Sequence, residues 1–483
     1  MKMALTLVSI KGLYNKERRL FMKKNDELLQ ITFEGVCNKL TYLGLGETKY
    51  KDEVIYVPDF YPGEEGKILV SYKRNGQYFG KLLSLSKPSK DRIPSECPYF
   101  KQCGGCIFQD YSYEKEKEHK RLLIQNQLHK ITGVDVDVDP TIGMEDPTHY
   151  RNKIQLHFGK DKNGSTVLGF YKEGTHVVFP VKKCLIEDSR ASDISNQILA
   201  LVRDLEIPPY EEETDTGELK HLLIRTSYHE KQILCVLVTK DLDFTNRDKL
   251  ITMIQRCCPQ ITTLVQSVNG KKTNVILGNK EVVLYGPGYI EDELCGLSFK
   301  ISARSFYQVN PEMTEILYKK AMELADLKKE DVVLDAYSGI GTIGLIASKY
   351  AQKSIAVEII PEAVKDSIEN AKRNGIRNFE AHEDDATSFI QKYAKLGMKV
   401  DVLFMDPPRK GSTSEFLEAV KELQPRKVLY IACGPSSLAR DLKELLNDYS
   451  LDAVQPIDMF PRTAHVETIC LLTRKNLNMP KIA

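Results

Sequence analysis

The sequence of 483 residues lacks the features that would place it in a membrane or on a secretory route. No apolar run approaches the roughly 18 residues that a membrane-spanning helix needs. The first residues are apolar, but Lys11 interrupts them early and no small-residue cleavage site follows, so they predict no secretory signal. Met22 is an alternative start to Met1, and residues 1–27 are then a leader. We therefore expect a protein without membrane association.

Charge of one sign is not in excess, and no internal repeat or low-complexity tract is present. The 68 Lys and Arg residues nearly balance the 67 Asp and Glu residues, which leaves a net charge of +1. This balance gives no overall signature of nucleic-acid binding, so a basic surface would have to be a local patch. The length predicts two to four domains, and a hydrophobic fraction of 42% suffices for a sizeable core. No sequence feature indicates an obligate protein partner.

Eleven cysteines in a long chain without a secretory signal indicate the cytoplasm rather than a disulfide framework. Cys97, Cys103 and Cys106 are close together, and Cys184 lies far downstream. The glycine pair Gly104-Gly105 lets this loop fold tightly, and an intracellular cluster of this kind predicts a metal site. Zinc and an iron–sulfur cluster both accept four thiolates, so the spacing leaves these two open beside the simpler reading of unrelated cysteines.

The N-terminal third of the chain changes character twice. Residues 28–86 consist of short strand-like runs separated by glycines, which is the pattern of a small all-β barrel. Residues 87–92 follow as a polar linker. After the cysteines, residues 113–131 predict a strongly charged helix with an apolar stripe that includes Leu123 and Ile124. The charge run of this helix is typical of a solvated face.

The rest of the chain mixes strands and helices. Between residues 150 and 300, strand-like runs alternate with two helical stretches, which predicts a mixed α+β region. From residue 311 onwards strands and helices alternate regularly, which predicts a doubly wound parallel sheet. The expected fold class is therefore α/β, with a leader and three domains at residues 1–27, 28–88, 89–300 and 301–483.

A glycine-rich turn between an apolar strand and a helix indicates a cofactor site. The run DAYSGIGTIG begins at Asp335, and its glycines allow close backbone approach to a ligand. Glu358 ends the next strand, where an acid can hydrogen-bond ribose hydroxyls. Such a turn alone is shared with nicotinamide and flavin binders, and it also occurs as a structural turn that binds nothing. The pattern D-x-x-S-G-x-G-T and the strand end Asp406-Pro407-Pro408 favour S-adenosylmethionine.

Two residues near the C-terminus suit covalent catalysis. Cys433 ends a strand-like run before Gly434-Pro435, so its thiol lies where a cofactor would lie. A thiolate is a strong nucleophile, and a helix that begins near Ser436 has a dipole that would lower the thiol pKa. Glu467, beside His465, supplies a carboxylate that can take a proton from carbon when it is desolvated. The alternatives are a small buried cysteine and a surface carboxylate at a strand start.

This pair of residues fits methylation of a pyrimidine ring. Uracil C5 is a poor nucleophile, but addition of a thiolate at C6 forms an enolate that makes C5 reactive toward a sulfonium methyl group. A base then removes the C5 proton, and elimination releases the cysteine. A uracil stacked in RNA has to be flipped out before this can happen. Phe306 is a candidate stacking surface for it, although an aromatic in such a run is as often part of the core.

Together these segments resemble the bacterial RNA (uracil-5-)-methyltransferases, in particular the 23S ribosomal RNA members that carry an iron–sulfur cluster. The resemblance extends from about residue 28 to the end of the chain and rests on CPYFKQCGGC, SFYQVN, DAYSGIGTIG, Cys433 and Glu467. It implies a Rossmann-like class I methyltransferase domain, a central mixed α+β iron–sulfur domain, and an N-terminal TRAM-like β-barrel that binds RNA. It also implies S-adenosylmethionine and a 4Fe-4S cluster as cofactors, and 23S ribosomal RNA as the partner.

The resemblance further implies roles for individual residues. Cys433 would be the nucleophile and Glu467 the base, with Phe306 near the target uracil. The implied cofactor contacts are Gln308, Tyr337, Glu358, Asp406 and Asp385 (or its neighbour Asp384), and the implied cluster ligands are Cys97, Cys103, Cys106 and Cys184.

Two segments depart from the family pattern. The usual S-C-N-P is Ala432-Cys433-Gly434-Pro435 here, which removes polar contacts beside the thiol and affects rate or substrate positioning rather than reaction type. The usual F-P-H-T contains Arg462, and an arginine suits a phosphate. A transfer-RNA uridine methylase is the runner-up, and a catalytically weakened RNA-binding or assembly protein is the alternative from another class. An iron–sulfur redox protein is disfavoured, because the cysteines are distant from any flavin or nicotinamide signature.

Overall fold

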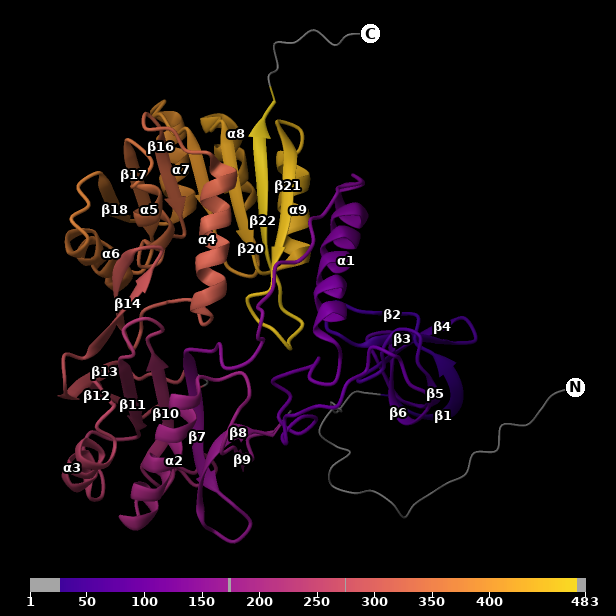
Figure 1. Ribbon diagram of the computed structural model, residues 1–483, viewed down its shortest axis with the longest axis vertical. Coiled ribbons are helices and arrows are strands. Elements are labelled where there is room, and N and C mark those ends of the chain that lie inside the picture. Colours follow the sequence, from indigo (N-terminus) through magenta and orange to yellow (C-terminus); the bar gives the residue numbers. More distant parts are fainter. Residues whose placement is uncertain (1–26, 173–174, 274, 476–483) are drawn as a thin grey trace, which may run out of the picture. The chain divides into compact units, whose positions relative to one another are not determined.

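The computed structural model describes residues 27–172, 175–273 and 275–475 (Figure 1). Residues 1–26 of the expected leader lie outside the described residues. Among those that are described, no helix is both long enough and apolar enough to cross a membrane. The chain divides into two compact units, of which the second contains most of the helices and strands.

The first unit comprises residues up to Arg92 together with 99–107 and 171–177. It contains a six-stranded sheet in the order β1-β5-β6-β4-β3-β2. The strands are β1 (Glu27–Val36), β2 (Lys39–Leu40), β3 (Gly46–Tyr50), β4 (Glu53–Val57), β5 (Glu65–Arg74) and β6 (Gln77–Lys87). Alternate residues of β5, such as Ile68 and Val70, are buried, because successive side chains of a strand point to opposite faces. The sequence predicts four of these strands, and the structure adds the short β2 and the polar β3.

The central part of the second unit is a seven-stranded sheet in the order β13-β12-β11-β10-β7-β8-β9. Its elements are β7 (Lys153–Lys160), β8 (Thr166–Tyr171), β9 (Val178–Pro180), α2 (Ser189–Asp204), β10 (Leu219–Thr226), β11 (Ile233–Thr239), α3 (Arg247–Cys257), β12 (Thr263–Val268) and β13 (Lys280–Tyr285). The helices α2 and α3 share an apolar core with one face of this sheet, which includes Ile154 and Ile224. A hairpin of β14 (Tyr289–Leu294) and β15 (Leu297–Ser302), which the sequence did not predict, leads out of this region.

The C-terminal part of the second unit is another seven-stranded sheet, in the order β18-β17-β16-β19-β20-β22-β21. Its strands are β16 (Val332–Ala336), β17 (Lys353–Glu358), β18 (Phe379–Glu383), β19 (Val402–Met405), β20 (Lys427–Ala432), β21 (Tyr449–Ile457) and β22 (Glu467–Arg474). The strands β16 to β20 are parallel, as the sequence predicts. In contrast, β22 runs antiparallel to both β20 and β21, because a direct connection rather than a crossover helix joins β21 to β22.

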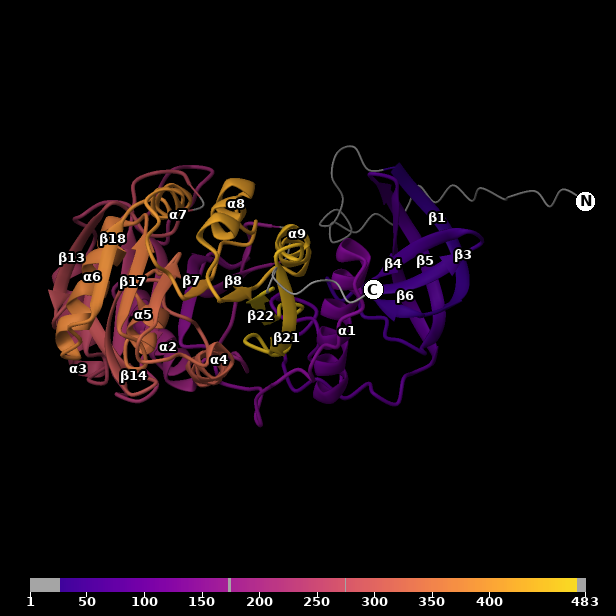
Figure 2. The same ribbon diagram turned by 90° about the horizontal axis from the view of Figure 1, so that it is seen from above.

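Helices cover both faces of the C-terminal sheet (Figure 2). They are α1 (Tyr113–Thr132), α4 (Pro311–Ala325), α5 (Thr342–Ala347), α6 (Pro361–Arg373), α7 (Ala386–Lys395), α8 (Ser414–Leu423) and α9 (Pro435–Leu445). On one face α1, α7, α8 and α9 pack into a single apolar core with the strands. On the other face α4 contacts β20 and β22, and α5 contacts β16 and β17. Both layers leave the carboxyl ends of the parallel strands at one edge.

Candidate active site

The candidate active site lies at that edge of the C-terminal sheet. The parallel strands β16, β17, β19 and β20 all end there, and ligands of open α/β sheets bind at the carboxyl ends of strands. Strand β22 is antiparallel to β20, and Ala432 pairs with Thr468. Cys433 and Glu467 are the next residues on the two strands, so the register places them opposite each other.

Cys433, Glu467 and Asp406 influence one another electrostatically. Glu467 is 6% exposed, and its burial, followed by the charge of Asp406, raises its pKa to about 8. Burial also raises the pKa of Asp406. Burial and then the charges of Glu467 and Asp406 raise the pKa of the Cys433 thiol to about 11, while Arg409 opposes the shifts at both residues. Burial and neighbouring charge thus disfavour the ionised forms of both the Cys433 thiol and Glu467.

The net pKa of the Cys433 thiol is raised, whereas the sequence predicts a helix dipole that lowers it. The helix α9 begins at Pro435 with Gly434 as its N-cap, so the thiol precedes the first turn. Burial and two carboxyl groups outweigh the helix dipole, and the pKa of Cys433 is raised. Burial and the neighbouring carboxyl groups therefore favour the protonated form of the Cys433 thiol.

The glycine-rich turn after β16 is built around two acids. Asp335 is fully buried, and its Oδ2 accepts a hydrogen bond from the Gly344 N–H at 2.7 Å, whereas its Oδ1 is buried without a hydrogen-bond partner. Burial raises the pKa of Asp335 to about 8. An added Cβ at Gly344 would lie 3.0 Å from Oδ2, so the glycine permits this close approach. Glu358 accepts hydrogen bonds from the N–H groups of Gly339 and Ile360, each at 2.9 Å, which fixes it beside the turn.

Tyr337 and Asp385 flank the same turn. Tyr337 has a φ of 65°, and its hydroxyl lies 3.3 Å from the hydroxyl of Ser412. Its pKa is raised by burial and, to a smaller extent, by the charge of Asp385. Asp385 is exposed and caps helix α7 by accepting a hydrogen bond from the Ser388 N–H at 3.0 Å. Asp384, its neighbour, accepts a hydrogen bond from the Asp385 N–H at 2.8 Å. The structure thus gathers Asp335, Tyr337, Glu358 and Asp385 around the turn.

Phe306 and Gln308 lie on the segment between β15 and α4. The Phe306 side chain is 68% exposed, so it is not part of the core. The backbone carbonyl of Gln308 accepts a hydrogen bond from the Asn152 side chain at 3.1 Å. Within the described residues, no hydrogen bond or ion pair connects either of them to Cys433 or Glu467. The segment is therefore available to a ligand rather than committed to the catalytic pair.

Gly434, the first departure from the family pattern, has a structural reason. An added Cβ at Gly434 would lie 2.6 Å from the Ser437 Oγ and 3.1 Å from the backbone oxygen of Arg409. The Ser437 hydroxyl lies 3.0 Å from the carbonyl oxygens of both Arg409 and Gly434. The missing asparagine side chain thus makes room for Ser437, which connects the helix after Cys433 to the loop that carries Arg409.

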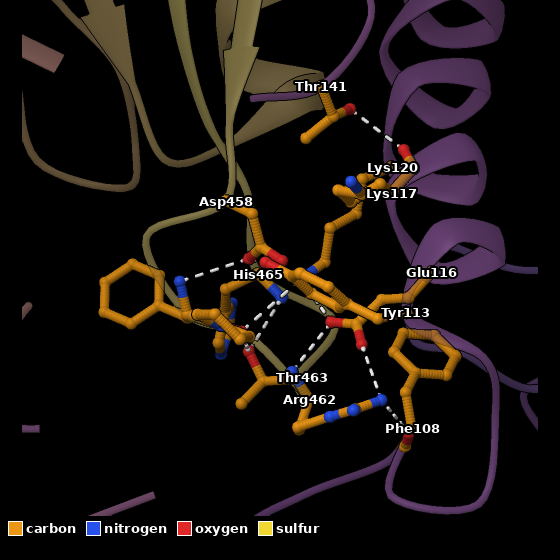
Figure 3. Close-up of polar contacts among 12 residues, drawn as sticks. Phe108, Tyr113, Glu116, Lys117, Lys120, Thr141, Asp458, Arg462, Thr463 and His465 are labelled. Carbon is orange, nitrogen blue, oxygen red and sulfur yellow. Dashed lines mark hydrogen bonds and ion pairs between the residues drawn. The ribbon is translucent and has the colours of Figure 1, made fainter. Parts of the chain in front are cut away.

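The loop that precedes Glu467 is fastened to helix α1 by a buried ion-pair cluster of Glu116, Lys120 and Asp458 (Figure 3). The Lys120 ammonium donates to Glu116 Oε1 and to Asp458 Oδ1, each at 2.7 Å, and all three side chains are fully buried. The backbone N–H of Arg462 donates to the same Glu116 oxygen at 2.7 Å. The Tyr150 hydroxyl adds a hydrogen bond to the Pro461 carbonyl at 3.0 Å. The loop that precedes Glu467 is therefore fixed in position by contacts with helix α1 and with Tyr150.

Arg462, the second departure, serves the fold rather than a phosphate. Its side chain is only 14% exposed, and its Nη1 donates to the carbonyl oxygens of Phe108 and Tyr111 at 3.3 and 3.0 Å. The guanidinium also lies 3.8 Å from Glu116 and above the Tyr113 ring (Figure 3). These contacts occupy the side chain on the α1 side of the loop, so the expectation of a phosphate contact at Arg462 is wrong.

The position of α1 at this site differs from the prediction. The charge run predicts a solvated face, yet Glu116 and Lys120 are fully buried. The signal was present in the spacing, because these residues continue the stripe of Leu123, Ile124 and Leu128 at helical intervals.

The four cysteines expected to bind a cluster are all half-buried, unlike core cysteines such as Cys235. Gly104 in their loop has a φ of 67°, which a glycine tolerates. Among the described residues, however, no group of three or more His, Cys, Asp or Glu side chains is arranged to hold a metal ion. Four thiolates fit a metal or an iron–sulfur cluster by residue type, and no step of a reaction is assigned to such a group.

The fold defines a mixed α/β methyltransferase-like protein. The solved structure of the tRNA (uracil-54, C5)-methyltransferase of Pyrococcus abyssi, in complex with S-adenosyl-L-homocysteine, matches it with a TM-score of 0.72. The match covers 91% of this chain and 100% of that chain at 24% sequence identity, a level at which the likeness concerns the fold.

Sequence comparisons define the family. Residues 112–475 match the family model of the tRNA (uracil-5-)-methyltransferases. An RNA methyltransferase of Oceanobacillus iheyensis is 39% identical over 457 residues, which cover 94% of this chain and 98% of that protein. An RNA methyltransferase of Staphylococcus aureus is 36% identical over 442 residues, or 91% of this chain and 98% of that protein. The chain therefore belongs to the tRNA (uracil-5-)-methyltransferase family of enzymes.

Proposed function

We propose that the protein transfers a methyl group from S-adenosylmethionine to C5 of a uridine in RNA, with Cys433 as nucleophile and Glu467 as base. The observation that carries this proposal is the opposition of Cys433 and Glu467 at the strand edge beside the glycine-rich turn. A nucleophile and a base on adjacent strands fit a ring that is attacked at one carbon and deprotonated at the next.

The Cys433 thiol gives its proton to solvent, the resulting thiolate forms a bond to uracil C6, and the electrons of the C5–C6 double bond move into an enolate. The enolate carbon C5 then takes the methyl group, whose bond to the sulfonium sulfur breaks with the electron pair left on that sulfur. Glu467 removes the proton from C5, the electrons of the C5–H bond restore the double bond, and the bond between sulfur and C6 breaks to release the thiolate. The C5 proton is left on Glu467 and passes to solvent.

Several residues would hold the methyl donor. When bound, S-adenosylmethionine supplies an electrophilic methyl group on a sulfonium. Asp335 has a buried carboxyl oxygen without a partner, and Glu358, Tyr337 and Asp385 surround the same turn. Asp406 follows the neighbouring strand β19, and Gln308 lies on the exposed segment with Phe306. We infer that these six residues form the cofactor contacts and that Phe306 receives the flipped uracil.

The RNA substrate that we propose is 23S ribosomal RNA. We further propose that residues 28–88, which contain the six-stranded sheet of the first unit, form a TRAM-like barrel that binds this RNA. In this sheet Tyr72 stacks on Phe79 with ring centroids 5.0 Å apart, and the Arg74 guanidinium lies 5.0 Å from the Tyr72 ring. Aromatic rings interleaved with cations suit RNA bases and phosphates. Transfer RNA is the second candidate, because the matching family model is described by tRNA.

Two further elements complete the proposal. The central region, residues 89–300, would carry a 4Fe-4S cluster on Cys97, Cys103, Cys106 and Cys184, and residues 301–483 would form the methyltransferase domain. The support for the cluster is the cysteine spacing and the half-buried state of all four thiols. We propose that the protein acts in the cytoplasm.

Mapping of 5-methyluridine tests the function. Unmodified 23S ribosomal RNA and transfer RNA are each incubated with anaerobically purified protein and S-adenosylmethionine, and the products are mapped by mass spectrometry. We expect a new methyl group in 23S RNA with the wild-type protein and none with Cys433→Ala, which still binds the cofactor. Methylation of transfer RNA alone would transfer the proposal to that substrate, and normal turnover by Cys433→Ala would overturn the covalent mechanism.

A further inference from the structure

A group of three basic residues lies where strands β7 and β10 pair, and we refer to Arg151, Lys153 and Arg225 as the cation group. Lys153 in β7 is directly opposite Arg225 in β10. Arg151 precedes β7, and its Nε donates to the Lys153 carbonyl at 3.1 Å. Like charges directly opposite each other on neighbouring strands destabilise a sheet. Within the described parts of the chain, none of the three forms an ion pair with a carboxylate.

Burial makes this arrangement more costly. Arg225 is 3% exposed, and its Nε is buried without a hydrogen-bond partner. Lys153 is half-buried, and burial followed by the charges of Arg225 and Arg151 lowers its pKa to about 8. Glu187 is close enough to feel the charge of Arg151, but burial raises its pKa to about 7, so it does not supply a full negative charge at neutral pH. The cation group thus holds positive charge that the fold itself leaves uncompensated.

The cation group also supports the segment that presents Phe306. The Arg225 guanidinium donates to the carbonyl of Ser305, and Asn152, between Arg151 and Lys153, donates to the carbonyl of Gln308. These contacts hold the backbone on both sides of Phe306, whose side chain is 68% exposed. The ends of β7 and β10 that carry the positive charge therefore also support the backbone of the segment that exposes the Phe306 ring.

We propose that Lys153, flanked by Arg151 and Arg225, binds a backbone phosphodiester group of the RNA. This inference rests on the proposed function, in which Phe306 receives the target uracil. A phosphate oxyanion supplies the negative charge that the cation group lacks and accepts hydrogen bonds from the Lys153 ammonium. Phosphate contacts fix the register of a nucleic acid without reading its bases. The subsite would therefore hold the backbone while Phe306 and Cys433 act on the base.

The salt dependence of RNA binding tests this subsite. The probe is a fluorescently labelled single-stranded oligouridine of about 15 nucleotides, titrated at several KCl concentrations with S-adenosylhomocysteine present to prevent turnover. Each phosphate contact on single-stranded nucleic acid contributes about 0.7 to the slope of log affinity against log salt. We expect Lys153→Met to weaken binding and to reduce this slope by about 0.7, and Lys153→Arg to retain it.

Lys160→Met is the matched control, because Lys160 ends the same strand but pairs with Glu211 at 2.6 Å on the surface. Its slope should equal that of the wild type, and retained binding of S-adenosylhomocysteine by calorimetry shows that each variant is folded. Should Lys153→Met fail this check, Arg151→Gln takes its place with the same expected change. A wild-type slope in the folded variant would overturn the subsite. It would also be overturned if inorganic phosphate, replacing chloride at equal ionic strength, did not compete with RNA for the wild-type protein.

The outcome is separable from that of the methylation assay. A reduced slope for Lys153→Met in a protein that methylates no RNA would uphold the phosphate subsite and reject the proposed reaction. An unchanged slope in a protein that makes 5-methyluridine would reject the subsite alone.

Discussion

The second unit contains two groups of buried charge that differ in whether the fold balances them. In the ion-pair cluster, Lys120 lies between Glu116 and Asp458, and every member is fully buried. In the cation group, like charges face each other across two strands without a carboxylate partner among the described residues. The candidate active site shows the opposite imbalance, since the charge of Asp406 raises the pKa of Glu467 and both carboxyl groups raise the pKa of the Cys433 thiol.

We infer from this difference that the ion-pair cluster stabilises the fold, whereas the cation group is available to a ligand. A buried charge costs several kcal/mol unless a partner or a hydrogen-bond network compensates it. In the ion-pair cluster the Lys120 ammonium has two carboxylate partners at 2.7 Å, which fasten the loop before Glu467 to α1. In the proposals above, the cation group would be compensated by a phosphate, and the acids of the candidate active site would meet the cofactor and the uracil. The following changes are expected to distinguish the two kinds of group.

The largest effect is expected from removal of the base. Glu467→Gln keeps the shape of the side chain but cannot accept the C5 proton, so methylation turnover should fall by about 10²–10⁴-fold. The covalent protein–RNA adduct should accumulate, because its formation does not need Glu467. Denaturing gel electrophoresis with labelled RNA would detect it, and Cys433→Ala combined with Glu467→Gln serves as the control without an adduct. Full activity and no adduct would remove Glu467 from the role of base.

Breaking the balanced cluster is expected to cost stability. Lys120→Met leaves Glu116 and Asp458 buried without their cation, so the free energy of unfolding should fall by about 3–5 kcal/mol. Urea denaturation measures this change. Lys117→Met is the matched control on the same helix: its partner Glu114 is 82% exposed, and such a surface pair contributes about 0.2–1 kcal/mol. Equal stability of the two variants would contradict the view that the buried cluster, unlike the surface pair, stabilises the fold.

The pH dependence sharpens the comparison at the catalytic edge. Burial raises the pKa of Glu467 from the ordinary 4.5 to about 8, so the ionised base becomes more abundant as the pH rises toward 8. The rate of adduct decay in single-turnover experiments should rise about tenfold per pH unit below 8 and level off above it. The folded chain binds this proton more tightly than the unfolded chain, so its contribution to stability is greatest below pH 4.5 and is lost between 4.5 and about 8. A pH-independent decay rate would contradict the assignment.

The cofactor edge was predictable from the sequence, whereas its support was not. A glycine-rich turn after an apolar strand and a cysteine before Gly434-Pro435 are local patterns, and the structure has strand ends at both places. The antiparallel β22, which sets Glu467 opposite Cys433, depends on how β21 and β22 connect, and alternation of strands and helices does not reveal this. The contact between Lys120 and Asp458 joins residues 338 positions apart, so no local pattern could have indicated it.

The smallest expected effect concerns the departure beside the nucleophile. Ser437→Ala removes the hydroxyl that lies 3.0 Å from the Arg409 carbonyl, which should cost about 1 kcal/mol of unfolding free energy. Gly434→Asn introduces a Cβ only 2.6 Å from the same hydroxyl and should cost a similar amount by turning Ser437 away. Because both changes break one contact, the double variant should be no less stable than either single variant. Additive losses of unfolding free energy in urea denaturation would show that Gly434 and Ser437 act independently. Gly434 would then not be needed to make room for the contact between the Ser437 hydroxyl and the Arg409 carbonyl.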